Sequence, residues 1–315
     1  MPRRTPSALL SARRLAAVPV LATLALLGVA QPASAAGTTP QQQAAAFTKA
    51  FAGTTASITA GVLDDSGSQL AAVRDTTALP PASTEKIATV GTALKVFGPS
   101  YRFQTLLQGT APLPSRLLWK GVRPTYYPGA VVVVGSGDPS LRNAGLATLL
   151  TALPKAGITS ITGGLWLDVS LFDQVRTAPG WKASWLGTEV GPLSAFMLEQ
   201  NRYRTDSAFL ADPDTGNLQT IASWLSSHGV TVRGGLHVGR PSLPTRTLST
   251  VTSATLSTIA ATTLQDSVNT WAEMLLKAVG ASDGNGSTAH GLAVVRSTVA
   301  GVGGDLGTAY DGSGL

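Results

Sequence analysis

The amino-acid sequence predicts a mixed α/β (α+β) fold. A helical repeat follows Pro81, with apolar residues three or four positions apart over 87–97. Two short apolar runs, 57–63 and 69–73, enclose turn-forming residues in a pattern typical of a β-hairpin. Across 106–245, short strand-like runs alternate with turns rich in glycine and proline. Helical and strand patterns therefore occur in the same chain.

The first 35 residues have the features of a secretory signal peptide. Four arginines precede an apolar run over 15–30, and Ala33-Ser34-Ala35 gives the small-x-small pattern of a cleavage site. No later stretch reaches the roughly 18 uninterrupted apolar residues that span a bilayer, so we expect no transmembrane anchor in the mature chain. We therefore expect an exported protein of 280 residues (315 minus 35) that begins at Ala36.

Composition excludes several classes of protein. Without the four leader arginines, 19 Lys+Arg face 17 Asp+Glu, a net charge of +2, and no basic block remains to indicate a nucleic-acid partner. The chain has no cysteine, which excludes disulfides, thiol catalysis and thiolate metal sites. His228, His237 and His290 lack metal-ligand spacing, so we expect neither a metal nor another cofactor.

The elements follow one another along the chain. A helix is expected to begin near Pro40, ahead of the hairpin, and the helix over 86–97 is expected to end at Gly98-Pro99. The later patterns predict strands at 130–134, 164–169 and 230–238, and helices at 218–225, at 256–264 and from near Thr270.

The segment Pro81-Ala82-Ser83-Thr84-Glu85-Lys86 contains the first candidate site. Residues three apart on a helix are neighbours, with β-carbons roughly 5–6 Å apart, so Lys86 can reach the Ser83 hydroxyl. This arrangement places a nucleophile beside a possible base. A serine-rich chain with seven lysines can also contain S-x-x-K by chance, and Lys86 could equally be a solvated helix residue.

Ser267 and Asn269 form the second candidate cluster. Residues two apart in an extended loop point to the same side, so a hydroxyl and an amide could face one site ahead of the helix from Thr270. Ordinary helix capping is the alternative, because Ser and Asn favour helix N-termini. Glu273 and Lys277 have the spacing of a surface i, i+4 pair, whereas Trp271 is expected in the core.

Three segments together resemble the D-alanyl-D-alanine carboxypeptidase/endopeptidase (DacB-like) family of low-molecular-mass penicillin-binding proteins. They are the S-x-x-K segment around Ser83, Ser267-Val268-Asn269 with Ala272-Glu273, and Asp311-Gly312-Ser313-Gly314-Leu315. Stretches over 135–141, 166–172 and 194–201 resemble inserted domains of this family. The 184 positions between Ser83 and Ser267 exceed what a simple β-lactamase needs.

The resemblance implies a penicillin-binding/β-lactamase-like catalytic domain split by inserted β-rich domains. We expect residues 36–105 and 246–315 to form the two parts of this domain, with 106–245 inserted. It also implies peptidoglycan stem peptides ending in D-Ala-D-Ala as substrates, β-lactams as covalent inhibitors, and a periplasmic or extracytoplasmic location at the cell wall.

The resemblance also implies a role for each site residue. Ser83 would form the acyl-enzyme and Lys86 would act as general base, which requires a lowered pKa of Lys86. Ser267 would transfer the proton towards the leaving amine, and Asn269 would orient Lys86 and the substrate. The Ser83 backbone N–H would form one arm of an oxyanion hole.

The third motif of the family, K-T-G, is absent. None of the seven lysines precedes Thr-Gly or Ser-Gly, and Val268 stands where an aspartate is common in S-D-N. We expect that the sequence is a fragment that ends before K-T-G and lacks the C-terminal strands of the sheet. We also expect this chain to be impaired or inactive as given, because losing one oxyanion donor typically costs on the order of 10² to 10³ in rate.

Other functions remain open from sequence. A catalytically silent penicillin- or peptidoglycan-binding protein could keep the fold without turnover, and a β-lactamase uses similar first two motifs. A Ser-His-Asp hydrolase is less favoured, because no G-x-S-x-G elbow encloses a serine. Carboxypeptidase and endopeptidase action both fit the residues.

Overall fold

The computed structural model describes residues 39–54, 57–75, 77–113, 126–202 and 209–315. The expected signal peptide, residues 1–35, lies outside these described residues. The chain forms two compact units, one up to Leu79 and one from Pro80 onward. Within the described ranges, no helix combines the length and the apolar character needed to cross a membrane.

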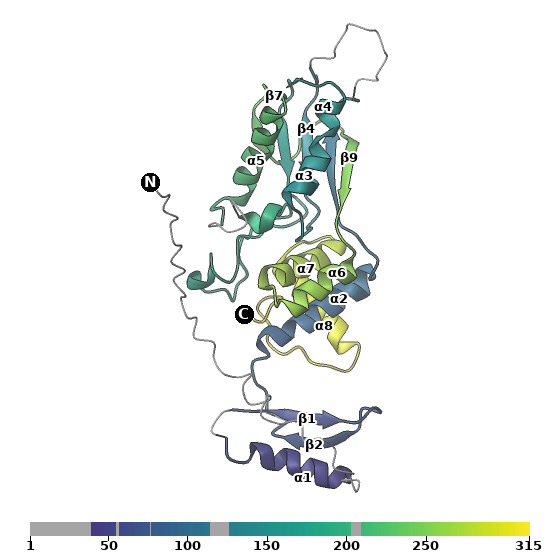
Figure 1. The fold of residues 1–315 in the computed structure, drawn as a ribbon, viewed down its shortest axis with the longest axis vertical. Coiled ribbons are helices and arrows are strands. Elements are labelled where there is room, and N and C mark those ends of the chain that lie inside the picture. The colour runs from purple at the N-terminus through teal and green to yellow at the C-terminus, as the bar shows by residue number, and fades with distance from the viewer. Residues whose placement is uncertain (1–38, 55–56, 76, 114–125, 203–208) are drawn as a thin grey trace, which may run out of the picture. The chain divides into compact units, whose positions relative to one another are not determined.

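The first unit contains a helix and a β-hairpin (Figure 1). Its elements are α1 (Pro40–Phe51), β1 (Ala60–Leu63) and β2 (Gln69–Val73). Thr39 caps α1 by accepting a hydrogen bond from a backbone N–H of the first turn. The carboxylate of Asp64 accepts two backbone N–H groups of the turn between the antiparallel strands. The predicted helix start and hairpin are confirmed.

The second unit contains a five-stranded mixed sheet, which confirms the α/β class. Its strands are β3 (Gln104–Gly109), β4 (Val131–Val134), β6 (Leu165–Asp168), β8 (Leu236–Val238) and β9 (Arg246–Thr252). The spatial order is β8-β6-β4-β3-β9, in which β4, β6 and β8 run parallel and β3 is antiparallel to both of its neighbours. Because β3 pairs with β9, the two ends of the region expected to be inserted meet in one sheet.

Helices cover this sheet, and their apolar side chains pack with those of the strands to form the core. They are α3 (Asn143–Leu150), α4 (Ala152–Lys155) and α5 (Pro213–Ser227). Leucines of α3 and α5 pack with the fully buried side chains of β3, β4 and β6, for example Leu149 with Leu107 and Leu167 in the same apolar cluster. Alternate residues of each strand point to opposite faces, so the members of this cluster on β4, Val131 and Val133, share one face, while Val132 is buried on the other.

The prediction of a single strand over 230–238 is wrong. The structure divides it into β7 (Thr231–Val232), which pairs with β5 (Ser160–Ile161), and β8, which joins the large sheet. The division falls at Gly234 and Gly235, and the positive φ of Gly235 (87°) does not fit a continuous strand.

A group of packed helices carries the sequence motifs (Figure 1). It consists of the 3₁₀ helix η1 (Ala82–Glu85), α2 (Lys86–Phe97), α6 (Leu256–Gln265), α7 (Asn269–Ser282) and α8 (Thr288–Ala300). Helix α2 packs against α6, α7 and α8, and α7 also packs against α8. Gly98 ends α2 with a positive φ, as its sequence position predicts. Two further 3₁₀ turns are η2 (Ala183–Trp185) and η3 (Leu198–Asn201).

Candidate active site

Ser83 and Lys86 are brought together at the start of α2. Ser83 lies on the exposed 3₁₀ turn η1, and Lys86 is the first residue of the α-helix that continues from it. The Lys86 Nζ atom lies 2.8 Å from Ser83 Oγ. Ser83 is therefore open to solvent, while Lys86 behind it is only 1% exposed.

Burial controls the protonation of Lys86. Desolvation lowers the pKa of this amine, whereas the charges of Asp311 and Glu85 oppose that change by raising it. The net direction is downward, so burial outweighs the two carboxyls. The Lys86 amine also donates a hydrogen bond to the Ser313 carbonyl at 2.9 Å. A neutral amine is therefore easier to reach here than on a surface lysine.

Residues 311–315, called the 311–315 segment below, form a tight turn against this pair. The Asp311 carboxylate accepts hydrogen bonds from Gly314 N at 2.8 Å, from the Ser313 hydroxyl, and from Trp181 Nε1 at 2.7 Å. Gly314 has a φ of +70°, and a Cβ at that position would lie 1.9 Å from the Ala82 carbonyl oxygen. Only glycine therefore lets the segment lie against the turn that carries Ser83.

Glu273 on α7 also binds this segment. Its carboxylate accepts a hydrogen bond from Gly312 N at 2.7 Å and one from the Thr288 hydroxyl. Glu273 is fully buried, and this burial raises the pKa of its carboxyl to about 7. The predicted surface pair of Glu273 with Lys277 is wrong, because neighbouring helices bury nearly all of α7 and Lys277 pairs with Asp173 instead.

Glu85 is the second carboxyl with a strongly raised pKa. Burial, followed by the charge of Asp311, raises the pKa of Glu85 to about 7, while the charge of Lys86 acts in the opposite direction. Its Oε1 atom is buried and makes no hydrogen bond in the described structure. An unpartnered buried carboxyl oxygen is costly when ionised, which agrees with the raised pKa.

Ser267 and Asn269 lie at the N-terminal end of α7. Ser267 is exposed and has a φ of +52°, and Asn269 is the first residue of the helix. The capping interpretation is not supported, because the N-cap residue is Val268 and α7 has no side-chain cap. Among hydrogen bonds between described residues, none joins Ser267 or Asn269 to the Ser83–Lys86 pair. Asn269 Oδ1 is buried and accepts no hydrogen bond from any described residue.

Three residues around Lys86 were not singled out by sequence reasoning as parts of the site. Thr89 donates to the Gly312 carbonyl at 2.8 Å, Asp311 forms the turn, and Glu273 holds it from α7. Asp311 and Glu273 belonged to stretches that carried the family resemblance, but no local sequence pattern indicated the hydrogen bonds that they make. The i, i+3 spacing of Thr89 from Lys86 was the only available hint.

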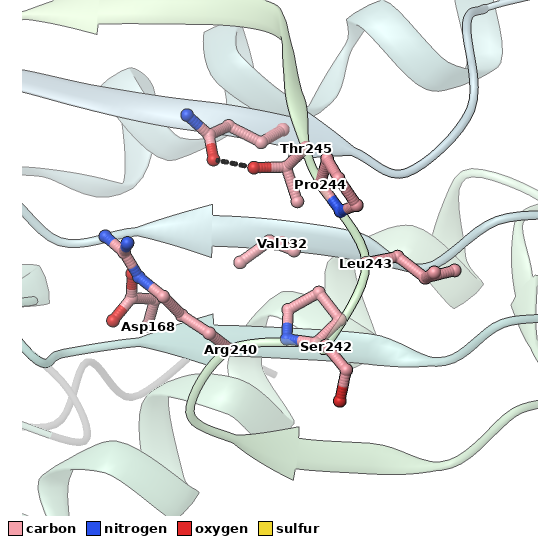
Figure 2. A pocket seen from close by; sticks show the side chains of 9 residues that line it. Val132, Asp168, Arg240, Ser242, Leu243, Pro244 and Thr245 are labelled. Atoms are coloured by element: carbon pink, nitrogen blue, oxygen red, sulfur yellow. Dashed lines mark hydrogen bonds and ion pairs between the residues drawn. The ribbon is translucent and has the colours of Figure 1, made fainter.

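Two hollows among the described residues lie away from Ser83. One, of about 280 Å³, is covered by the chain from Arg240 to Thr245, where Arg240 pairs with buried Asp168 and Thr245 donates to Gln108 (Figure 2). Another, of about 620 Å³, lies beside Tyr101. Neither is lined by Ser83 or Lys86, so the candidate site rests on the nucleophile–amine geometry. Within the described part of the chain, no three acidic or histidine side chains gather to hold a metal.

Residues 43–209 and 199–315 match the model of the D-Ala-D-Ala carboxypeptidase 3 (S13) family. The chain belongs to this family. It is 32% identical over 100 residues to the D-alanyl-D-alanine carboxypeptidase DacB of Haemophilus influenzae, a match that covers 32% of this chain and 19% of that protein. The family resemblance seen in the sequence is confirmed.

Further relatives agree with this membership. The chain is 28% identical over 197 residues to carboxypeptidase Rv3627c of Mycobacterium tuberculosis, covering 54% of this chain and 39% of that protein. The chain therefore spans less than half the length of these curated relatives. Penicillin-binding protein 4 (dacB) of Haemophilus influenzae shares the fold, with a TM-score of 0.67, 19% identity, and coverage of 79% of this chain and 69% of that chain. Its complex with a novel β-lactam gives a TM-score of 0.59 at 19% identity, covering 80% and 68%.

Proposed function

We propose that this S13 family member is a serine-type D-Ala-D-Ala carboxypeptidase/endopeptidase that acts on peptidoglycan stem peptides. The observation that carries the proposal is the 2.8 Å contact between the exposed Ser83 hydroxyl and the buried Lys86 amine, whose pKa is lowered. A hydroxyl beside a readily neutralised amine is the arrangement of an activated nucleophile. The leader at residues 1–35 supports export to a compartment where the cell wall is accessible.

The reaction proceeds through an acyl-enzyme. Neutral Lys86 removes the proton of Ser83, and Ser83 Oγ attacks the carbonyl carbon between the two D-alanines. The backbone N–H of Ser83 stabilises the oxyanion. The bond to the terminal D-alanine nitrogen breaks, and that nitrogen receives the proton through Ser267. Water then hydrolyses the ester and regenerates Ser83.

Asn269 orients Lys86 and the substrate amide in this scheme. Its Oδ1 atom is a buried acceptor with no hydrogen-bond donor among the described residues, on the first turn of a helix that packs against α2. Such an atom is expected to find a donor in the working complex. A cross-linking peptide bond in place of the terminal pair gives endopeptidase cleavage by the same steps. No cofactor takes part.

Covalent labelling tests the proposal. The full-length protein, as its gene encodes it, is incubated with a penicillin, and intact mass and peptide mapping locate the adduct. We expect one penicilloyl group on Ser83, none on the Ser83→Ala variant, and release of D-alanine from a peptide ending in D-Ala-D-Ala. Absence of the adduct would indicate a silent wall-binding protein, and rapid penicillin hydrolysis without D-alanine release would indicate a β-lactamase. Either result overturns the proposal.

A further inference from the structure

A continuous set of contacts joins Glu273 to Ser83. Glu273 Oε2 accepts from Gly312 N at 2.7 Å, and the carbonyl of the following residue, Ser313, accepts from Lys86 Nζ at 2.9 Å. Lys86 Nζ in turn lies 2.8 Å from Ser83 Oγ. The position of the Ser313 carbonyl is therefore fixed by a carboxylate on a different helix, α7.

The Ser313 carbonyl determines how the Lys86 amine is oriented. A neutral amine has two N–H groups and one lone pair, and it can take the Ser83 proton only if the lone pair faces Ser83 Oγ. An N–H held by the Ser313 carbonyl leaves the lone pair free for Ser83. If the carbonyl shifts, an N–H can turn towards Ser83 in place of the lone pair.

The 311–315 segment is held from two sides at Gly312. Besides Glu273, the Thr89 hydroxyl on α2 donates to the Gly312 carbonyl at 2.8 Å. A Cβ at Gly312 would lie 2.9 Å from Leu276 Cβ and 3.0 Å from the Ala272 carbonyl, so the backbone lies directly on α7. Of these contacts, only the hydrogen bond to Glu273 satisfies the buried Gly312 N–H. A buried N–H without a hydrogen bond is unfavourable.

We propose that Glu273 is a positioning residue for acyl-enzyme formation, acting through Gly312 and the Ser313 carbonyl on the Lys86 amine. The inference rests on the proposed function, since it concerns how Lys86 activates Ser83. Glu273 is fully buried, and its carboxylate binds Gly312 and Thr288 and not Ser83. Its effect is on the rate of the chemical step and not on the binding of the substrate.

Two conservative substitutions separate positioning from simple packing. In Glu273→Gln, the amide oxygen can accept from Gly312 N while the amide nitrogen donates to the Thr288 hydroxyl, so both contacts are kept without a charge. Glu273→Leu keeps the bulk but removes both contacts. Thr288→Val removes only the hydrogen bond from the Thr288 hydroxyl to Glu273 and keeps the hydrogen bond between Glu273 and Gly312. It is therefore the matched control.

The experiment measures the rate constant of penicillin acylation on Ser83 and the preceding non-covalent binding constant, in the full-length protein. We expect Glu273→Leu to lower the acylation rate constant at least tenfold with little change in binding. Glu273→Gln and Thr288→Val are expected to stay within about threefold of wild type. Amide hydrogen exchange at Gly312 should accelerate in Glu273→Leu and remain slow in the other two variants.

Each outcome decides the inference. Equal acylation by Glu273→Leu and wild type overturns it, and so does a loss in Thr288→Val as large as that in Glu273→Leu. If Glu273→Leu does not fold, Thr89→Val releases the Gly312 carbonyl, which lies between the Gly312 N–H and the Ser313 carbonyl, from α2. Unchanged acylation by that variant would show that the contacts holding Gly312 do not affect Lys86, which overturns the inference. If wild type takes no penicillin on Ser83, the proposed function fails, while Gly312 exchange still shows whether Glu273 holds the segment.

Discussion

Replacing Glu273 by Gln is expected to change how stability depends on pH. The folded protein raises the pKa of this carboxyl from 4.5 to about 7 through burial. A raised pKa means that the folded state keeps a proton that the unfolded chain has already released, so stability falls as pH rises from about 4.5 to about 7. The difference of about 2.5 units, at 1.36 kcal/mol per unit, gives a loss of about 3 kcal/mol from this one group.

The assay is urea unfolding at pH 5, 6, 7 and 8, followed by tryptophan fluorescence. All six tryptophans lie in the unit that begins at Pro80, so the signal reports on the unit that contains Glu273. Because Gln is neutral throughout this range, Glu273→Gln should exceed wild type in stability by less than about 1 kcal/mol at pH 5, where the folded carboxyl is still protonated. At pH 8 the variant should be more stable by about 3 kcal/mol.

The control for this measurement is Glu85→Gln. The pKa of Glu85 is also raised to about 7, but Glu85 is partly open to solvent, so screening should make its gain at pH 8 smaller. The reasoning is refuted if the difference between Glu273→Gln and wild type is the same at pH 5 and pH 8, or if Glu273→Gln is less stable at pH 8.

Three further outcomes are expected. Lys86→Met keeps a long apolar stem in the buried position and should slow penicillin acylation of Ser83 by about 10² to 10⁴, measured by stopped-flow or mass spectrometry with circular dichroism as the folding control. Gly314→Ala places a Cβ 1.9 Å from the Ala82 carbonyl oxygen at a φ of +70°, so it should lower both the melting temperature and the acylation rate; wild-type values for both would contradict the close approach. Leu149→Ala opens a cavity at a fully buried site beside the sheet and should cost about 2–5 kcal/mol in urea unfolding, without slowing acylation at temperatures where the protein stays folded.

The parts of the site that the sequence predicted are local ones. The hairpin, the helix of Lys86 and its end at Gly98 follow from turn residues and apolar spacing within a few positions. The contact of Lys86 with Ser83 follows in the same way, because it joins residues three apart. The structure adds that Ser83 lies on a 3₁₀ turn and that the α-helix begins only at Lys86.

The parts that the sequence did not predict depend on which distant elements pack together. Lys86 and Ser313 are 227 positions apart, and Glu273 and Gly312 are 39 apart, so no periodicity links them. The i, i+4 spacing of Glu273 and Lys277 is typical of an exposed helix face. The sequence does not reveal that neighbouring helices bury this face of α7. The error at 230–238 has the same origin, because β7 and β8 join different sheets.

The carboxyls around Lys86 act on its amine in different ways. Ionised Glu85 and Asp311 raise the pKa of Lys86, yet burial and Asp311 raise the pKa of Glu85 itself to about 7. Below that pH, Glu85 is largely protonated and no longer opposes the effect of burial on Lys86. Asp311 has a different role, because its carboxylate accepts two hydrogen bonds within the turn that contains the Ser313 carbonyl and a third from Trp181. In the proposed mechanism, the carbonyl that orients Lys86 comes from a segment more than 200 residues away in the sequence, while Glu85, beside Lys86, responds to pH.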